Sequence, residues 1–116
     1  MTNDIEIIIA DSFEREAKRL IKRYRSLKKE LAELIGRLKI EPFIGADLGG
    51  GVRKIRLAIS SKGKGKSGGA RVIAHTDIVV EMMSGIVTLL YIYDKSEQST
   101  ISDKDIQKLL KVAGLN

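Results

Sequence analysis

The residues best able to do chemistry lie in one short stretch, from Val52 to His75, which carries seven cations and no Asp or Glu. Like charges repel one another, so folding alone does not favour this arrangement, whereas binding of a polyanion does. The stretch therefore predicts a surface for nucleic acid. The cations are Arg53, Lys54, Arg56, Lys62, Lys64, Lys66 and Arg71.

Three of these cations, Lys54, Arg56 and Arg71, are spaced so that they could act together. Lys54 and Arg56 are two residues apart in an expected strand over residues 52–59, so they share a face of a sheet. Arg71 lies in the next expected strand, over residues 70–76. Three converging cations could hold a scissile phosphate and stabilise its transition state, with a lysine as general base or acid. A cationic face that binds without cutting fits the same residues.

The loop between these two strands, SSKGKGKSGG, invites comparison with a nucleotide-binding P-loop. That motif, GxxxxGK[ST], would require glycine where this chain has Ser60, and the loop joins two strands instead of a strand and a helix. We therefore expect a cationic loop whose glycines let backbone N–H groups approach phosphates. The alternative is a loop that only aids solubility.

Other candidates flank this region. His75, the single histidine, could be a general base, although a lone histidine at a strand end is more often structural. Tyr91 and Tyr93 share a face of an expected strand over residues 86–93, where one could stack on a base or both could belong to the core. Lys95 follows that strand and could reach the same surface. With one His, no Cys and no acidic cluster of ligand spacing, we expect no metal or other cofactor.

The composition is that of a small basic domain. A length of 116 residues predicts a single domain, 1–116, and the net charge of +6 fits a polyanionic partner. The absence of cysteine excludes disulfides. The apolar run near the N-terminus is too short for a signal peptide, and no stretch approaches the roughly 18 apolar residues of a membrane span. We expect a cytoplasmic protein without a membrane partner.

The elements that must position these residues follow the order β-α-α-β-β-β-α, an α+β pattern. Apolar residues at steps of three and four from Phe13 to Leu38 predict a helical hairpin that begins at an Asp11 or Ser12 cap, breaks near residues 24–26 and ends at Gly36 and Pro42. Residues 44–51 are expected to form a flexible connection, and Ser102 to cap a last helix. The expected strands cover residues 5–10, 52–59, 70–76 and 86–93.

Three segments in order, GGVRKIR, GKGKSGGARVI and LLYIYDKSEQSTIS, resemble the RelE superfamily of toxins from type II toxin–antitoxin systems. The resemblance covers roughly residues 45–110 and is strongest to the HigB-like, phage-derived Gp49-like branch. It implies a RelE-like α+β fold. In that fold an N-terminal strand and helical hairpin pack on a small, mainly antiparallel four-stranded sheet, followed by a C-terminal helix.

The resemblance also implies an activity, cleavage of mRNA on the translating ribosome by a metal-independent endoribonuclease. In this chemistry the ribose 2′-OH attacks the adjacent phosphate and leaves a 2′,3′-cyclic phosphate. Matched by position, the catalytic basic side chains are Lys54, Arg56, Arg71 and Lys95. Expected partners are mRNA, ribosomal RNA and a cognate antitoxin, often with a helix-turn-helix domain. Contacts to RNA then fall on Arg53, Lys62, Lys64, Lys66, His75 and Tyr93, with the basic helical face from Arg15 to Lys29 as a second surface for ribosomal RNA.

Two departures from the family pattern leave other readings open. Many relatives carry two aromatics after RVI, where this chain has Ala74 and His75. Its last helix also lacks the Tyr or Arg that some relatives place there. One alternative is an inactive relative that binds RNA or ribosomes without cutting. Another is a module whose basic surface meets only an acidic antitoxin segment.

Overall fold

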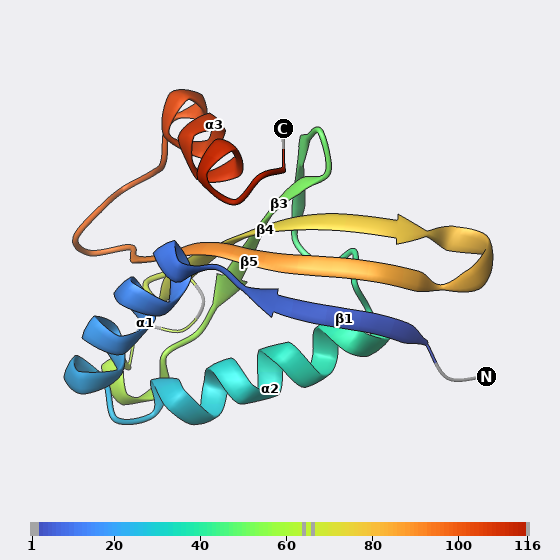
Figure 1. Cartoon of the computed structure of the whole chain (residues 1–116). Helices are drawn as coiled ribbons and strands as arrows, with labels where there is room; N and C mark the ends of the chain where they lie inside the picture. The colour runs from blue at the N-terminus through green and yellow to red at the C-terminus, as the bar shows by residue number, and fades with distance from the viewer. Residues whose placement is uncertain (1–2, 64, 66, 116) are drawn as a thin grey trace.

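The computed structural model describes residues 3–63, 65 and 67–115, and in this part of the chain the elements surround one sheet (Figure 1). The predicted α+β class and element order are confirmed, with one strand added. The strands are β1 (Asp4–Ile9), β2 (Ala46–Gly49), β3 (Val52–Leu57), β4 (Ala70–Val79) and β5 (Ser84–Asp94). The helices are α1 (Asp11–Arg23), α2 (Leu27–Ile40) and α3 (Asp103–Val112), and short 3-10 turns cover Ser60–Lys62 and Val80–Met82.

Over the described residues the strand order is β1-β5-β4-β3-β2, with β1 parallel to β5 and every other pair antiparallel. The expectation of four strands and a flexible 44–51 connection is corrected here, because Ala46–Gly49 pairs with β3 as an edge strand. Glycines with positive φ at residues 49, 50 and 51 allow the chain to reverse tightly between β2 and β3. The sequence interpretation took the same glycines as a sign of flexibility.

The two faces of the sheet carry different helices, as Figure 1 shows: α1 and α2 cover one face and α3 lies over the other. Alternation along β4 illustrates the division. Val72 and Ala74 pack in the cluster under α1 and α2, whereas Ile73 packs in the cluster under α3. Lys54 and Arg56 of β3 and Arg71 of β4 share the Ile73 face of the sheet, and this is where the candidate site forms.

The helix boundaries confirm the predicted break, since α1 ends at Arg23 and α2 begins at Leu27. The predicted cap of α1 is wrong. Ala10 occupies that position, and the Ser12 hydroxyl instead donates to the Leu90 carbonyl of β5 at 2.5 Å. Gly36 lies inside α2 and does not end it.

At the other end of the chain, the predicted cap of α3 is confirmed, because the Ser102 hydroxyl accepts a hydrogen bond from the Asp105 amide at 3.1 Å. The first turn of α3 also carries Asp103 and Asp105, whose charges suit a helix N-terminus.

Candidate active site

A groove of about 790 Å³ brings together the four side chains that the sequence singled out as catalytic. Lys54 and Arg56 come from β3, Arg71 from β4 and Lys95 from the turn after β5, although Lys95 is more than 20 residues from the others in sequence. The remaining described lining residues include Arg37 of α2 and no Asp or Glu. The groove is therefore a concentrated positive field at one end of the sheet.

The strand register explains how the cations meet. Arg56 lies directly opposite Arg71 in the β3–β4 pair, and Lys54 lies opposite Ile73. Directly opposite residues in an antiparallel pair share a face and have Cβ atoms only about 4.5–5.5 Å apart, where like charges destabilise the sheet. Two arginines thus stand directly opposite each other at a position where sheet stability alone would favour opposite charges.

The two arginines differ in their exposure to solvent. Arg71 is 6% exposed, and its guanidinium donates to the carbonyls of Ala70 at 3.2 Å and Ser67 at 3.4 Å. Arg56 is exposed. The site therefore combines a guanidinium that the backbone holds in place with one that can adjust to a ligand.

Lys95 is fixed through its backbone as well as its side chain. Its amide donates to the Gly69 carbonyl at 3.0 Å, which ties the turn after β5 to the start of β4. Its ammonium donates to the Ser99 carbonyl at 2.5 Å. Because Gly69 immediately precedes the strand that carries Arg71, this contact couples the positions of Arg71 and Lys95.

These side chains divide into two chemical kinds. The arginines stay protonated and present a planar set of donors that matches phosphate oxygens, so they suit charge stabilisation. The lysines Lys54 and Lys95 can exchange a proton, so they suit acid–base roles. A phosphodiester is the ligand class that such a groove fits.

Three residues predicted to contact RNA are not among the residues that line the groove. Arg53 points away from Lys54 because side chains alternate along a strand, and its guanidinium donates to the Ile44 and Gly45 carbonyls at 3.1 and 2.8 Å. Lys62 forms an ion pair with Asp94 and its side chain is only 8% exposed.

Tyr93 is the third of these residues outside the groove. It is only 2% exposed, so its ring belongs to the core and is not presented to a base. Burial raises the pKa of its hydroxyl. Lys64 and Lys66 lie outside the described residues.

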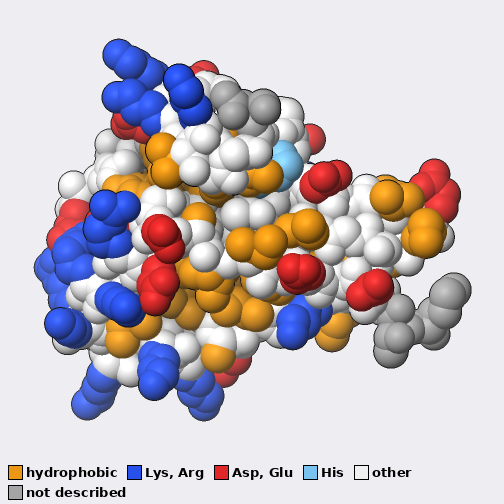
Figure 2. Space-filling view, viewed as in Figure 1, with side chains coloured by type: hydrophobic (Ala, Val, Ile, Leu, Met, Phe, Trp, Pro, Cys, Tyr) orange, Lys and Arg blue, Asp and Glu red, His pale blue; other side chains and the backbone are white. Residues whose placement is uncertain are grey.

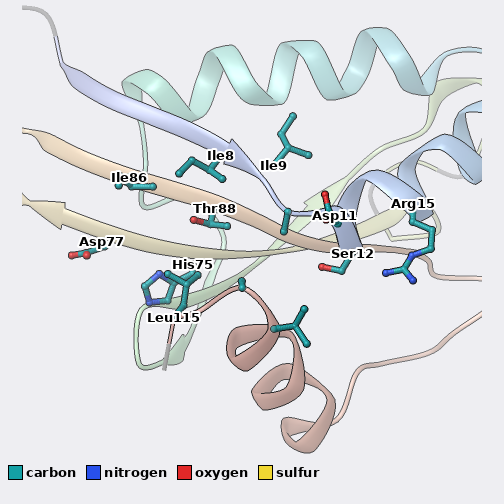
Figure 3. Close-up of a pocket in the computed structure, with 13 residues that line it drawn as sticks. Ile8, Ile9, Asp11, Ser12, Arg15, His75, Asp77, Ile86, Thr88 and Leu115 are labelled. Carbon is teal, nitrogen blue, oxygen red and sulfur yellow. The ribbon is translucent and has the colours of Figure 1, made fainter.

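His75 lies in a different pocket, of about 400 Å³, between the end of β1 and the last residues after α3 (Figure 3). At the usual strand rise its four-residue separation from Arg71 along β4 corresponds to about 13 Å. The close-up shows His75 beside Leu115, with Asp77 further along the same strand and Thr88 on the neighbouring β5. The lone histidine is therefore not grouped with the cations of the groove.

The position of Ala74 bears on one departure from the family pattern. Ala74 is 1% exposed and packs in the cluster under α1 and α2. It therefore faces away from Arg71, and the missing aromatic at this position does not remove a side chain from the groove.

Sequence reasoning missed two features of this region. Arg37 reaches the groove because α2 packs beside β3, a tertiary placement for which the sequence carries no local signal. Asp94 is fully buried at the end of β5, where it accepts hydrogen bonds from Lys62, Tyr24 and Ser96. An acid directly after the apolar run LLYIY was a signal that could have been noticed.

The Asp94 network also sets protonation states. Burial opposes ionisation of this carboxyl most strongly, but the hydrogen bonds from Lys62, Tyr24 and Ser96 together outweigh it and hold the Asp94 pKa well below its usual range. The hydrogen bond to Asp94 is the main reason that the Tyr24 pKa is raised.

The described residues contain neither a cluster of metal-ligating side chains nor a helix suited to span a membrane. Among the described residues, no three His, Cys, Asp or Glu side chains are close enough to hold a metal ion. None of the helices found in the described part of the chain is both long and apolar enough to cross a membrane.

Residues 7–115 match the family model described as the RelE toxin of the RelE/RelB toxin–antitoxin system. Since this match spans nearly the whole chain, the protein belongs to the RelE toxin family, and the predicted superfamily is confirmed. The fold, with its helices on both faces of a mostly antiparallel sheet, agrees with this family. No curated protein matches the chain. The HigB-like branch stays a prediction.

Proposed function

We propose that this protein is the toxin of a toxin–antitoxin pair that cleaves mRNA on translating ribosomes in the cytoplasm, within the HigB-like branch of the family. The observation that carries the proposal is the pairing of Arg56 with Arg71 in a groove that also holds Lys54 and Lys95, with no carboxylate among its described lining residues. A phosphodiester supplies the negative charge that this arrangement lacks.

In the proposed reaction the ribose 2′-oxygen attacks the adjacent phosphorus, and the bond from phosphorus to the 5′-oxygen of the next nucleotide breaks. Arg56 and Arg71 bind the non-bridging oxygens, on which negative charge increases in the pentacoordinate transition state. Lys54 and Lys95 act on opposite sides of the phosphorus, one accepting the 2′-OH proton and the other returning a proton to the 5′-oxygen. The products are a 2′,3′-cyclic phosphate and a 5′-OH.

A second basic surface is proposed to hold ribosomal RNA. Cationic side chains gather over the end of the molecule where α1 meets α2 (Figure 2). Several cations of α1 form ion pairs: Lys18 with Glu14, and both Arg19 and Arg23 with Glu97. Four other cations at this end of the molecule are exposed: Lys22, Arg25, Lys28 and Lys29. We refer to these four as the helical basic surface.

A cognate antitoxin is the implied protein partner, and we propose that an acidic segment of it covers the groove. Free toxin would then bind ribosomes, whereas the complex would not.

The experiment is induced expression in a bacterium with mapping of new 5′ ends on a translated message. Cuts inside the reading frame that disappear when the start codon is removed support ribosome-dependent cleavage. The variant Lys54→Ala/Arg56→Ala/Arg71→Ala is expected to abolish the cuts. Its control, Lys104→Ala/Lys108→Ala/Lys111→Ala, removes three α3 cations that do not line the groove and should still cut.

The outcomes separate the proposed nuclease from the alternatives. Cuts that persist in the groove variant would overturn the proposed site. Growth arrest and ribosome binding without cuts would support the second candidate, a binder that does not cleave, which the lack of Tyr or Arg in α3 favours.

A further inference from the structure

A buried polar network lies directly behind the groove and joins three segments that are far apart in sequence. The Asp94 carboxylate accepts from the Lys62 ammonium and the Ser96 hydroxyl on one oxygen, and from the Tyr24 hydroxyl on the other at 2.5 Å. The Ser96 amide donates to the same carboxylate at 2.9 Å. Tyr24 follows α1, Lys62 ends the turn after β3, and Asp94 ends β5.

The network is unusually well enclosed for charged groups in a small domain. The Asp94 side chain is 0% exposed and that of Lys62 is 8% exposed. The Lys62 ammonium also lies 5.6 Å from the centre of the Tyr24 ring, within range of a cation–π contact. Both oxygens of the Asp94 carboxylate therefore accept hydrogen bonds within this network.

Such a pair is a poor way to gain stability. Removing two charges from water costs several kcal/mol per ion, and apolar side chains of similar volume often stabilise a protein equally well or better. What the pair does supply is a single geometry, because each donor must meet a carboxylate oxygen at hydrogen-bond distance.

That geometry is passed on to the groove by short backbone links. Asp94 is followed by Lys95, and its partner on β4 is Ala70, which precedes Arg71. The Lys95 amide donates to the Gly69 carbonyl at 3.0 Å, and Gly69 immediately precedes Ala70. A shift of Asp94 would therefore displace two of the cations that line the groove.

We propose that the Lys62–Asp94 ion pair, with Tyr24, is a positioning device that fixes Arg71 and Lys95 relative to each other. Lys62 thus serves the reaction from behind the groove and does not contact RNA. The catalytic part of this inference rests on the proposed nuclease activity, while its structural part can be tested without it.

The test uses two variants of the full chain. Lys62→Met/Asp94→Asn removes both charges together, keeps the side-chain volumes similar and leaves an amide oxygen for Tyr24 and Ser96, so no lone charge is buried. Lys62→Arg retains the charge and serves as the conservative rescue. The control is Glu97→Gln, which weakens ion pairs from the same turn to Arg19 and Arg23 on the outside of α1.

The first measurement is amide hydrogen exchange in the purified proteins. The neutral pair is expected to exchange at least about tenfold faster at Lys95 and Arg71 while amides of β1 and α2 keep their protection, because only local order is lost. Lys62→Arg and Glu97→Gln should resemble the native chain. Equal protection at Lys95 and Arg71 in the neutral pair would overturn the proposal.

The second measurement is cleavage of a ribosome-bound message in a reconstituted translation system. Misplacement of reacting groups by about 1 Å can cost about 100-fold in rate, so we expect the saturating rate constant of the neutral pair to fall by at least tenfold. The toxin concentration for half-maximal rate should change less than twofold. A loss confined to that concentration would instead make Lys62 a binding residue and overturn the proposal. If the native chain itself does not cut, the proposed function has failed, and hydrogen exchange alone decides the positioning role.

Discussion

Arg56 and Arg71 are the pair of residues on which the proposed phosphodiester site chiefly rests. Opposite positions in an antiparallel pair normally carry groups that attract or pack, yet here two arginines occupy them. One is held by backbone carbonyls and the other is exposed. Arg56 therefore does not favour folding, whereas the proposed cleavage reaction requires it.

This conflict gives the first prediction. Arg56→Ala should leave the free energy of unfolding within about 0.5 kcal/mol of the native value, because an exposed side chain and a like-charge contact are lost together. It should lower the cleavage rate by about 100- to 1,000-fold, as expected for loss of one transition-state donor. Urea unfolding and cleavage on purified ribosomes measure the two effects. Lys104→Ala, outside the groove, should change neither, and a clear loss of stability in Arg56→Ala would contradict the argument.

The buried carboxylate gives a prediction in pH. Because the hydrogen bonds to Asp94 lower its pKa in the folded chain, the carboxyl binds a proton less readily when folded than when unfolded. The stability it contributes is thus complete above the unfolded pKa of about 3.9 and is lost as the pH falls further. We expect the urea midpoint to fall between about pH 5 and pH 3 more steeply in the native chain than in Lys62→Met/Asp94→Asn. Glu97, whose pKa is also lowered, chiefly by its hydrogen bond from Arg19, is present in both proteins. Parallel curves would show that Asp94 is not the titrating group.

At the scale of single residues, the sequence was sufficient wherever strand alternation determines which face of the sheet a side chain lies on. It placed Lys54 and Arg56 on one face because the spacing of two fixes that relation. It failed for Lys62 and Tyr93 because their environments depend on partners that come together only in the folded chain, Asp94 in one case and the cluster under α3 in the other. Lys62 lies in a Gly-rich loop, where the sequence predicts an exposed cation. In the folded chain its side chain is instead mostly buried and pairs with Asp94.

The elements explain why the groove lies where it does. β3 and β4 supply three cations, the turn after β5 supplies the fourth, and α2 adds Arg37 from the side. Most of these elements could be predicted, because apolar periodicity identifies a helical hairpin and branched residues identify strands. β2 could not, since ADLG is short and fully exposed and its pairing depends on the three glycines that follow.

Gly36 offers a test of helix packing. It lies inside α2, and a Cβ added there would have no heavy atom within 4 Å. Alanine should therefore stabilise the protein by roughly 0.5–1 kcal/mol, because it restricts the unfolded chain without a steric cost. A thermal melt of Gly36→Ala measures this.

Gly69 is the matched counterpart at the β3–β4 junction. A Cβ at this position would come within 2.1 Å of the Leu57 carbonyl oxygen, which is backbone and cannot turn aside. We expect Gly69→Ala to destabilise by about 1–3 kcal/mol, the usual cost of overpacking, and to separate Arg56 from Arg71. The same melt tests it, and a native-like melting temperature together with native-like cleavage would contradict the close approach of these strands.

At the scale of the whole molecule, the positive charge is divided between two surfaces, the groove and the helical basic surface. The net charge of +6 favours association with polyanions from a distance, and each contact to a nucleic-acid phosphate releases condensed counterions. Composition predicts a polyanionic partner, and the fold shows that the positive charge lies on more than one side of the molecule.

This division makes salt a useful probe. Lys22→Ala/Lys28→Ala should reduce the slope of log affinity for ribosomes against log salt concentration by roughly one to two, at about 0.7 per lost phosphate contact. The cleavage rate constant at saturating toxin should not change, since neither residue lines the groove. Sedimentation binding at several salt concentrations measures the slope, with Lys104→Ala/Lys111→Ala as the control of equal charge. An unchanged slope would exclude this surface from ribosome binding.

The parallel pairing of β1 with β5 has a consequence for the timing of synthesis. β1 is made well before β5, its strand partner among the described residues, so this pairing of the sheet cannot form until β5 has been made. Lys95 follows β5 directly, and the groove is likewise incomplete until that point. A nascent chain of this kind therefore completes its cation cluster only after β5 and Lys95 have been made.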